Sequence, residues 1–135
     1  MKFVLVSLCA IFCCYYSYAQ QDVDPDDYVW VEKKVKASAY NSTKAQTMGN
    51  PSIGAWGDIL VPGMKAIAIS RDLIKLGIGR NTPFKIEGYP GYYLVKDKMN
   101  ARYKNKIDLY MGKNIQKARE FGVRHLKVQY GIKKK

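Results

Sequence analysis

The stretch LVKDKMNARYKNKIDLYMG, residues 94–112, holds two segments rich in aliphatic and aromatic residues, joined by a polar segment. This composition is typical of two β-strands with a connecting loop. The only carboxylates of the stretch, Asp97 and Asp108, stand among five basic residues: Lys96, Lys98, Arg102, Lys104 and Lys106. A purely basic surface needs no acid, and a buried strand disfavours one. The two aspartates are therefore candidates for function.

Side chains alternate between the two faces of a β-strand. In the strand after the polar segment, Asp108 and Tyr110 share one face, opposite the aliphatic residues. In the strand before it, Asp97 shares its face with Val95. If the two strands were neighbours, both aspartates would meet on one surface with Tyr110 beside them.

Two carboxylates brought close together cannot both ionise freely, so one of them keeps its proton towards neutral pH. A carboxylic acid of this kind is what acid-catalysed cleavage of a glycosidic bond requires. The alternative is that both aspartates are exposed partners of the surrounding lysines, each pair contributing about 0–1 kcal/mol. Spacing alone leaves both interpretations open.

The rest of the chain predicts a mostly β fold: a small six-stranded barrel or sandwich with one or two short helices. A helical turn is expected at 71–77 and a helix after Asn114, its candidate N-cap, ending at Gly122. The connection Gly88–Gly91 is typical of a tight hairpin. The further strands are expected at residues 29–40, as one long strand or two short ones, and at 64–70, 84–87 and 123–132.

Residues 1–19 are typical of a secretory signal peptide, with Lys2 before an apolar run and small residues near Ala19. Residues 20–28 are predicted to be a flexible acidic leader, and 29–135 the single folded domain. The apolar run is too short to span a membrane. All three cysteines lie inside the signal segment. We therefore expect a secreted or periplasmic protein without disulfides.

The chain is strongly basic, with a formal net charge of +12 at pH 7. Such a charge suits a polyanionic partner: nucleic acid, anionic lipid or a carboxylate-bearing cell wall. Export argues against nucleic acid as the partner. The sequence contains no long amphipathic helix that would support stable membrane insertion. Cell-wall polysaccharide is the remaining partner, although the charge could also serve solubility alone.

Other chemistries find little support in the sequence. His125 is the only histidine and lies within a predicted strand, so neither a metal site nor a Ser–His–Asp arrangement is expected. We expect no cofactor. The loop at 41–58 is long for a compact domain, which favours a functional role. Tyr40 and Trp56, at its two ends, are candidates for stacking on sugar rings.

The order of four segments resembles the 3D domain, a family named for three aspartates. These segments are ASAYNS (37–42), AIAISRDLIKLG (66–77), YLVKDKMNARYKNKIDLYMG (93–112) and AREFG (118–122). The family includes membrane-bound lytic transglycosylase A and small secreted proteins that remodel the cell wall. The resemblance covers about residues 35–130 and implies a double-psi β-barrel.

The resemblance assigns roles to the aspartates. Asp97 matches the second family aspartate and Asp108 the third, which in the transglycosylase acts as acid and then as base. Asp108 would thus be the catalytic residue, with Asp97 orienting it and tuning its pKa. The first family aspartate falls on Ser70, and the glycines after the second are replaced by Lys98-Met99-Asn100.

The expected activity is cleavage of peptidoglycan glycan strands by a mechanism similar to that of lytic transglycosylases. Tyr40, Trp56, Ser70, Arg71 and Tyr110 are the expected substrate-binding residues. The alternative is a non-catalytic wall-binding module like the expansins, which resemble this barrel, and a third possibility is an interaction protein that keeps only the scaffold. We expect a monomer.

Overall fold

The computed structural model describes residues 22–42 and 53–135. The signal peptide and most of the long loop predicted to be functional lie outside the described residues. A short 3₁₀ helix, Pro25–Asp27, leads directly into the first strand. The acidic leader therefore ends in regular structure where it meets the domain.

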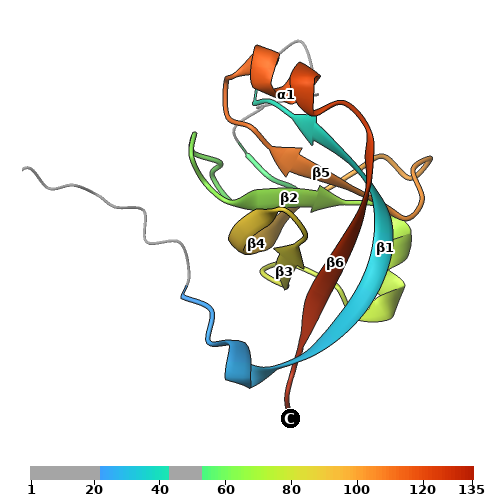
Figure 1. The fold of residues 1–135 in the computed structure, drawn as a ribbon. Coiled ribbons are helices and arrows are strands. Elements are labelled where there is room, and N and C mark those ends of the chain that lie inside the picture. Colours follow the sequence, from blue (N-terminus) through green and yellow to red (C-terminus); the bar gives the residue numbers. More distant parts are fainter. Residues whose placement is uncertain (1–21, 43–52) are drawn as a thin grey trace, which may run out of the picture.

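Six strands close into a barrel in the order β1-β5-β2-β4-β3-β6 (Figure 1). Parallel and antiparallel neighbours are mixed, because β1 pairs with β5 and β2 with β4 in parallel. The predicted mostly β, six-stranded barrel is confirmed. The strands are β1 (Tyr28–Tyr40), β2 (Ala66–Ile69), β3 (Pro83–Ile86), β4 (Tyr89–Lys98), β5 (Lys106–Tyr110) and β6 (Arg124–Lys133).

Strand β1 closes the barrel because it is long enough to serve two neighbours. Residues 28–37 pair with β6 in antiparallel orientation, and residues 36–40 pair with β5. Figure 1 shows β1 and β6 side by side along most of their length. Of the two possibilities for residues 29–40, one long strand or two short ones, the structure has the single long strand.

Two short helices follow the predicted start and stop signals. The 3₁₀ helix η2, Arg71–Leu76, ends at Gly77, whose φ of 87° is a left-handed value that glycine adopts readily. Helix α1, Ile115–Phe121, begins where the Asn114 side chain accepts a hydrogen bond from the Lys117 amide. Both helices are therefore confirmed.

The hairpin between β3 and β4 forms, but its turn differs from the prediction. Ile86 pairs with Tyr89, so the turn consists of Glu87 and Gly88, with Gly88 at φ 83°. Pro90 lies within β4, where the register with β3 is irregular. The irregularity accommodates a residue that has no backbone N–H to donate.

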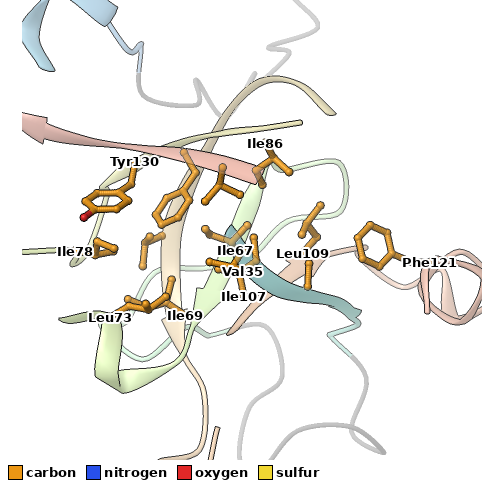
Figure 2. Packing of buried hydrophobic residues seen from close by; sticks show 14 residues of the cluster. Val35, Ile67, Ile69, Leu73, Ile78, Ile86, Ile107, Leu109, Phe121 and Tyr130 are labelled. Carbon is orange, nitrogen blue, oxygen red and sulfur yellow. The ribbon is translucent and has the colours of Figure 1, made fainter. Parts of the chain in front are cut away.

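The barrel interior is filled by aliphatic and aromatic side chains (Figure 2). Ile67, Ile69, Ile107 and Leu109 are fully buried there, together with Phe84 from β3. A second, smaller cluster forms around Leu60, Ala66 and Tyr110, which are not part of this interior set. The residues between these aliphatic ones on β2 and β5 consequently face outward.

Candidate functional site

A row of four residues crosses the outer face of the barrel. Ser38 on β1 pairs with Asp108 on β5, Asp108 pairs with Ala68 on β2, and Ala68 pairs with Asp97 on β4. Directly paired residues point to the same face of a sheet. We call these four residues the carboxylate row. Two strand spacings separate its aspartates, so their Cα atoms lie about 10 Å apart.

The two aspartate strands are not neighbours, because β2 lies between them. Both acids nevertheless share one surface. The predicted face of Asp108 and Tyr110, opposite Ile107 and Leu109, is confirmed by the burial of the two aliphatic residues in the core.

The face predicted for Asp97 is wrong, and the reason is a β-bulge. Ile67 pairs with Val95 while the next residue, Ala68, pairs with Asp97, so Lys96 is an extra residue in β4. Bulges of this kind turn the following side chain to the other face. Val95 therefore packs in the core, and Asp97 joins the outer row.

Asp108 is held by one hydrogen bond and one ion pair. The Ser38 hydroxyl donates a hydrogen bond to Asp108 Oδ1, and Lys106 Nζ lies 3.7 Å from the same oxygen. Sequence reasoning did not single out Ser38. The alternation of side chains along β1 could have predicted that Ser38 faces outward. The neighbouring residues do not show that Ser38 pairs with Asp108.

Asp97 is half-buried and accepts two backbone hydrogen bonds at Oδ1. The Ala55 amide donates at 2.9 Å and the Lys98 amide at 2.8 Å. Burial raises the pKa of Asp97 above its ordinary value, against the opposing effect of these amides and of the Lys98 charge. Asp97 is thus the member of the row whose protonated form is favoured by its surroundings.

Tyr40 places a phenol beside both carboxylates. Its hydroxyl is buried and has no hydrogen-bond partner among the described residues. Burial, and then the charges of Asp97 and Asp108, raise the pKa of Tyr40 far above its ordinary range, so the phenol keeps its proton. The ring packs on Tyr110 at 5.5 Å between centroids. Tyr110 is held in turn by a 2.9 Å hydrogen bond between its hydroxyl and Ser42 Oγ.

The segment 54–58 lies directly on β4 next to Asp97. A Cβ atom on Gly54 would collide with the carbonyl oxygen of Lys96, so glycine permits this approach. The next residue, Ala55, donates to Asp97. Trp56 packs partly against the core, and Lys98 Nζ lies 5.2 Å from the centroid of its ring. Trp56 therefore borders the Asp97 end of the row.

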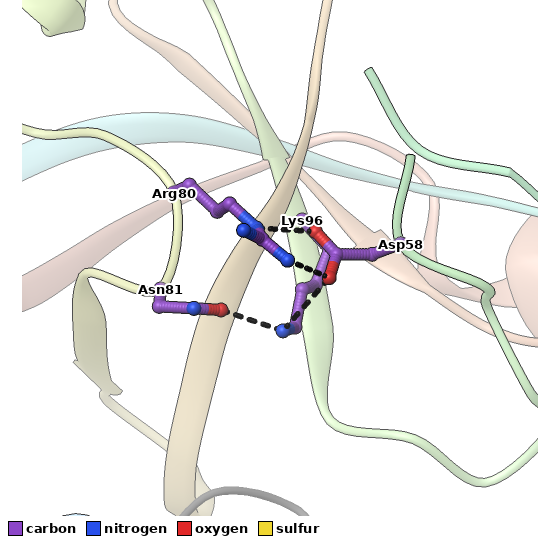
Figure 3. A network of polar contacts seen from close by, with 4 residues as sticks. All are labelled: Asp58, Arg80, Asn81 and Lys96. Atoms are coloured by element: carbon purple, nitrogen blue, oxygen red, sulfur yellow. Dashed lines mark hydrogen bonds and ion pairs between the residues drawn. The ribbon is translucent and has the colours of Figure 1, made fainter. Parts of the chain in front are cut away.

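An ion-pair network secures this segment (Figure 3). Arg80 donates to both carboxylate oxygens of Asp58, at 2.7 and 2.9 Å. Lys96 Nζ lies 3.6 Å from Asp58 and also donates to Asn81. The Arg80 hydrogen bond lowers the pKa of Asp58. The bulged residue Lys96 thus anchors the loop that covers Asp97.

The structure does not bring Ser70 and Arg71 into the row. Ser70 is fully buried, and its hydroxyl accepts a hydrogen bond from the Lys106 amide at 2.9 Å. Arg71 donates through Nε to the carbonyl of Met99. Both residues join the start of η2 to neighbouring segments. Of the expected site residues, Asp97, Asp108, Tyr40, Trp56 and Tyr110 lie together.

Among residues 22–42 and 53–135, no set of three or more His, Cys, Asp or Glu side chains is arranged to bind a metal ion. Within the same ranges, no helix has the length and apolar character needed to cross a membrane.

Comparison with known proteins shows a relationship of fold. No protein-family model matches the chain, and no curated protein matches it, so membership of the 3D family stays a prediction. Among solved structures, the chain is similar to the apo form of an expansin from Clavibacter michiganensis, with 17% identity and a TM-score of 0.50. The match covers 78% of this chain and 52% of that chain, so the chain spans about half the length of the expansin. At this identity the likeness concerns the fold alone: the chain shares the double-psi β-barrel of the expansin.

Proposed function

We propose that this chain is an exported module that binds cell-wall polysaccharide, peptidoglycan in particular, through the outer face of β1, β5, β2 and β4. The observation that carries the proposal is the carboxylate row, bordered by Tyr40, Tyr110 and Trp56. Carboxylates accept hydrogen bonds from sugar hydroxyls, and a partly exposed aromatic ring such as that of Trp56 packs against the apolar face of a sugar. The expansin fold supports the same class of partner.

The binding mode does not require cleavage. Asp108 is engaged by Ser38 and Lys106, an arrangement suited to a fixed acceptor for hydroxyl groups. The strong positive charge of the chain favours approach to a wall that carries carboxylates.

A pull-down on purified sacculi tests the proposal. The wild-type protein should sediment with sacculi, and Asp108→Ala should weaken the affinity about tenfold, the size expected for losing one hydrogen bond to a charged group. Asp26→Ala, an exposed acid outside the barrel, is the matched control. Equal binding of Asp108→Ala and Asp26→Ala to sacculi would show that the carboxylate row does not bind the wall, and would overturn the proposal.

A second candidate is glycosidic cleavage, favoured by the raised pKa of Asp97 on the same face as Asp108. A carboxyl group would protonate the bridging oxygen, the bond from the muramyl C1 would break towards that oxygen, and the muramyl 6-hydroxyl would attack C1. Its proton would return to the carboxylate, giving a 1,6-anhydro ring. In this candidate mechanism Asp97 is the proton donor, whereas the family resemblance gives that role to Asp108.

Mass spectrometry of sacculi incubated with the protein separates the two candidates. Release of 1,6-anhydro muropeptides that both Asp97→Asn and Asp108→Asn abolish would establish cleavage. Sacculus binding without soluble products supports the binding module.

A further inference from the structure

A recessed surface separate from the carboxylate row lies where the turn at residues 62–65 meets the start of β4 and the segment joining β5 to α1. It is a cavity of about 530 Å³, within the size range of small-ligand sites. Tyr89, Tyr93 and Tyr110 are among its lining residues; Tyr89 and Tyr93 are partly exposed, whereas Tyr110 is buried. Its size and aromatic walls suit a sugar unit.

The cavity is positively charged. Lys65, Lys113 and Lys117 line it, and none of the described lining residues is acidic. Lys65 Nζ donates to the Pro90 carbonyl at 2.7 Å and lies 5.9 Å from the Tyr93 ring centroid, so its charge is fixed at the wall. Lys113 and Lys117 are exposed and form no ion pair with a described residue. Their ammonium groups remain available to an anion.

The aromatic walls are also fixed. The Tyr89 hydroxyl accepts a hydrogen bond from Arg124 Nη1 at 2.6 Å, and the Tyr89 ring packs on Phe121 at 5.6 Å between centroids. Tyr110 is held through Ser42. Rings that are already ordered lose little conformational entropy when a ligand packs on them.

Tyr110 connects the cavity with the carboxylate row. It lines the cavity and stands two residues beyond Asp108 on β5, about 7 Å along the strand. A polysaccharide lying over β5 would therefore place one unit at the row and a nearby unit in the cavity.

We infer that this cavity binds a carboxylate-bearing sugar unit, with Lys113 and Lys117 pairing with the carboxylate and the partly exposed Tyr89 and Tyr93 packing on the ring. The path of the glycan from the row to the cavity rests on the proposed function. The preference of the cavity for an acidic sugar rests on its own lining.

Isothermal titration calorimetry with two matched hexasaccharides tests this inference: galacturonic acid hexamer and its carboxyl-reduced galactose counterpart. Wild type should bind the acidic hexamer at least about tenfold more tightly at low salt, and Lys113→Ala/Lys117→Ala should remove most of this difference. Lys34→Ala/Lys75→Ala, two exposed lysines outside the cavity, removes the same net charge and should keep the preference.

The outcomes separate the inference from the proposed function. Equal loss in both double variants would reduce the effect to overall charge and overturn the inference, as would the absence of an acidic preference in wild type. Loss confined to the Lys113/Lys117 variant supports the inference, even if the protein does not sediment with sacculi. Sedimentation with sacculi that depends on Asp108, without any acidic preference, would leave the proposed function standing alone.

Discussion

The two faces of β5, β2 and β4 differ in what they contribute. The inner face carries aliphatic side chains such as Ile69, Ile107 and Val95, all fully buried. The outer face of the same strands carries Asp97, Asp108 and Tyr110 around Ala68. The core contacts and the proposed ligand contacts thus fall on alternate residues of these strands. One face can be changed without greatly disturbing the other.

The largest expected effect comes from the inner face. Ile69→Ala should lower the free energy of unfolding by about 2–5 kcal/mol, since it leaves a cavity among packed side chains. Asp108→Asn, on the outer face of the adjacent strand, should cost less than about 1 kcal/mol. Urea denaturation measures both values. A loss for Asp108→Asn as large as that for Ile69→Ala would break the division between the faces.

Gly54→Ala tests how the outer face is covered. The added methyl group meets the Lys96 carbonyl, so the segment over β4 must shift, at a cost of about 1–3 kcal/mol. Hydrogen exchange at the Ala55 amide, which donates to Asp97, should become faster. Gly79→Ala is the control, because nothing lies within 4 Å of a Cβ atom built there. Similar behaviour of the two variants would argue against close packing at Gly54.

Arg80→Gln weakens the anchor of the same segment. The Asp58–Arg80 pair has bidentate geometry, but the Arg80 side chain is half-exposed, so solvent screening keeps its contribution to stability small. Thermal unfolding should show a small loss that shrinks in high salt. Lys75→Gln, an exposed cation on η2, should show no comparable loss. A salt-independent effect would point to a role other than the ion pair.

The smallest effect concerns the pH dependence at Asp97. Its pKa is above 3.8 in the folded protein, so near that pH the folded state retains a proton that the unfolded chain has released. Stability should therefore fall as pH rises from about 4 through the folded pKa. Asp97→Asn keeps an Oδ1 acceptor for both backbone amides and should remove this component of the pH profile. Profiles that coincide would show that Asp97 titrates normally.

Local signals in the sequence were sufficient to predict the helix ends and the direction of the Asp108 side chain. The caps of α1 at Asn114 and Gly122, the stop of η2 at Gly77 and the outward face of Asp108 follow from neighbouring residues alone. These features depend on backbone conformation and alternation within a few positions. They need no knowledge of the partner strands.

The pairing of strands that are far apart in the sequence could not be predicted from such local signals. Nothing near Asp97 or Asp108 indicates that β2 lies between their strands, because that order arises from barrel closure. The burial of Ser70 depends on its contact with Lys106, which is 36 positions away. The aspartate pair could be selected from sequence, but its geometry could not.

The bulge at Lys96 has a consequence for comparing this protein with others. The outward direction of Asp97 depends on one additional residue in β4, and its distance from Asp108 along the chain depends also on the connecting loop. A motif search with a fixed interval between the two acids would therefore overlook barrels that present the same pair with a regular strand. Structures are better superposed on Ala68, which pairs with both aspartates, to find equivalent sites.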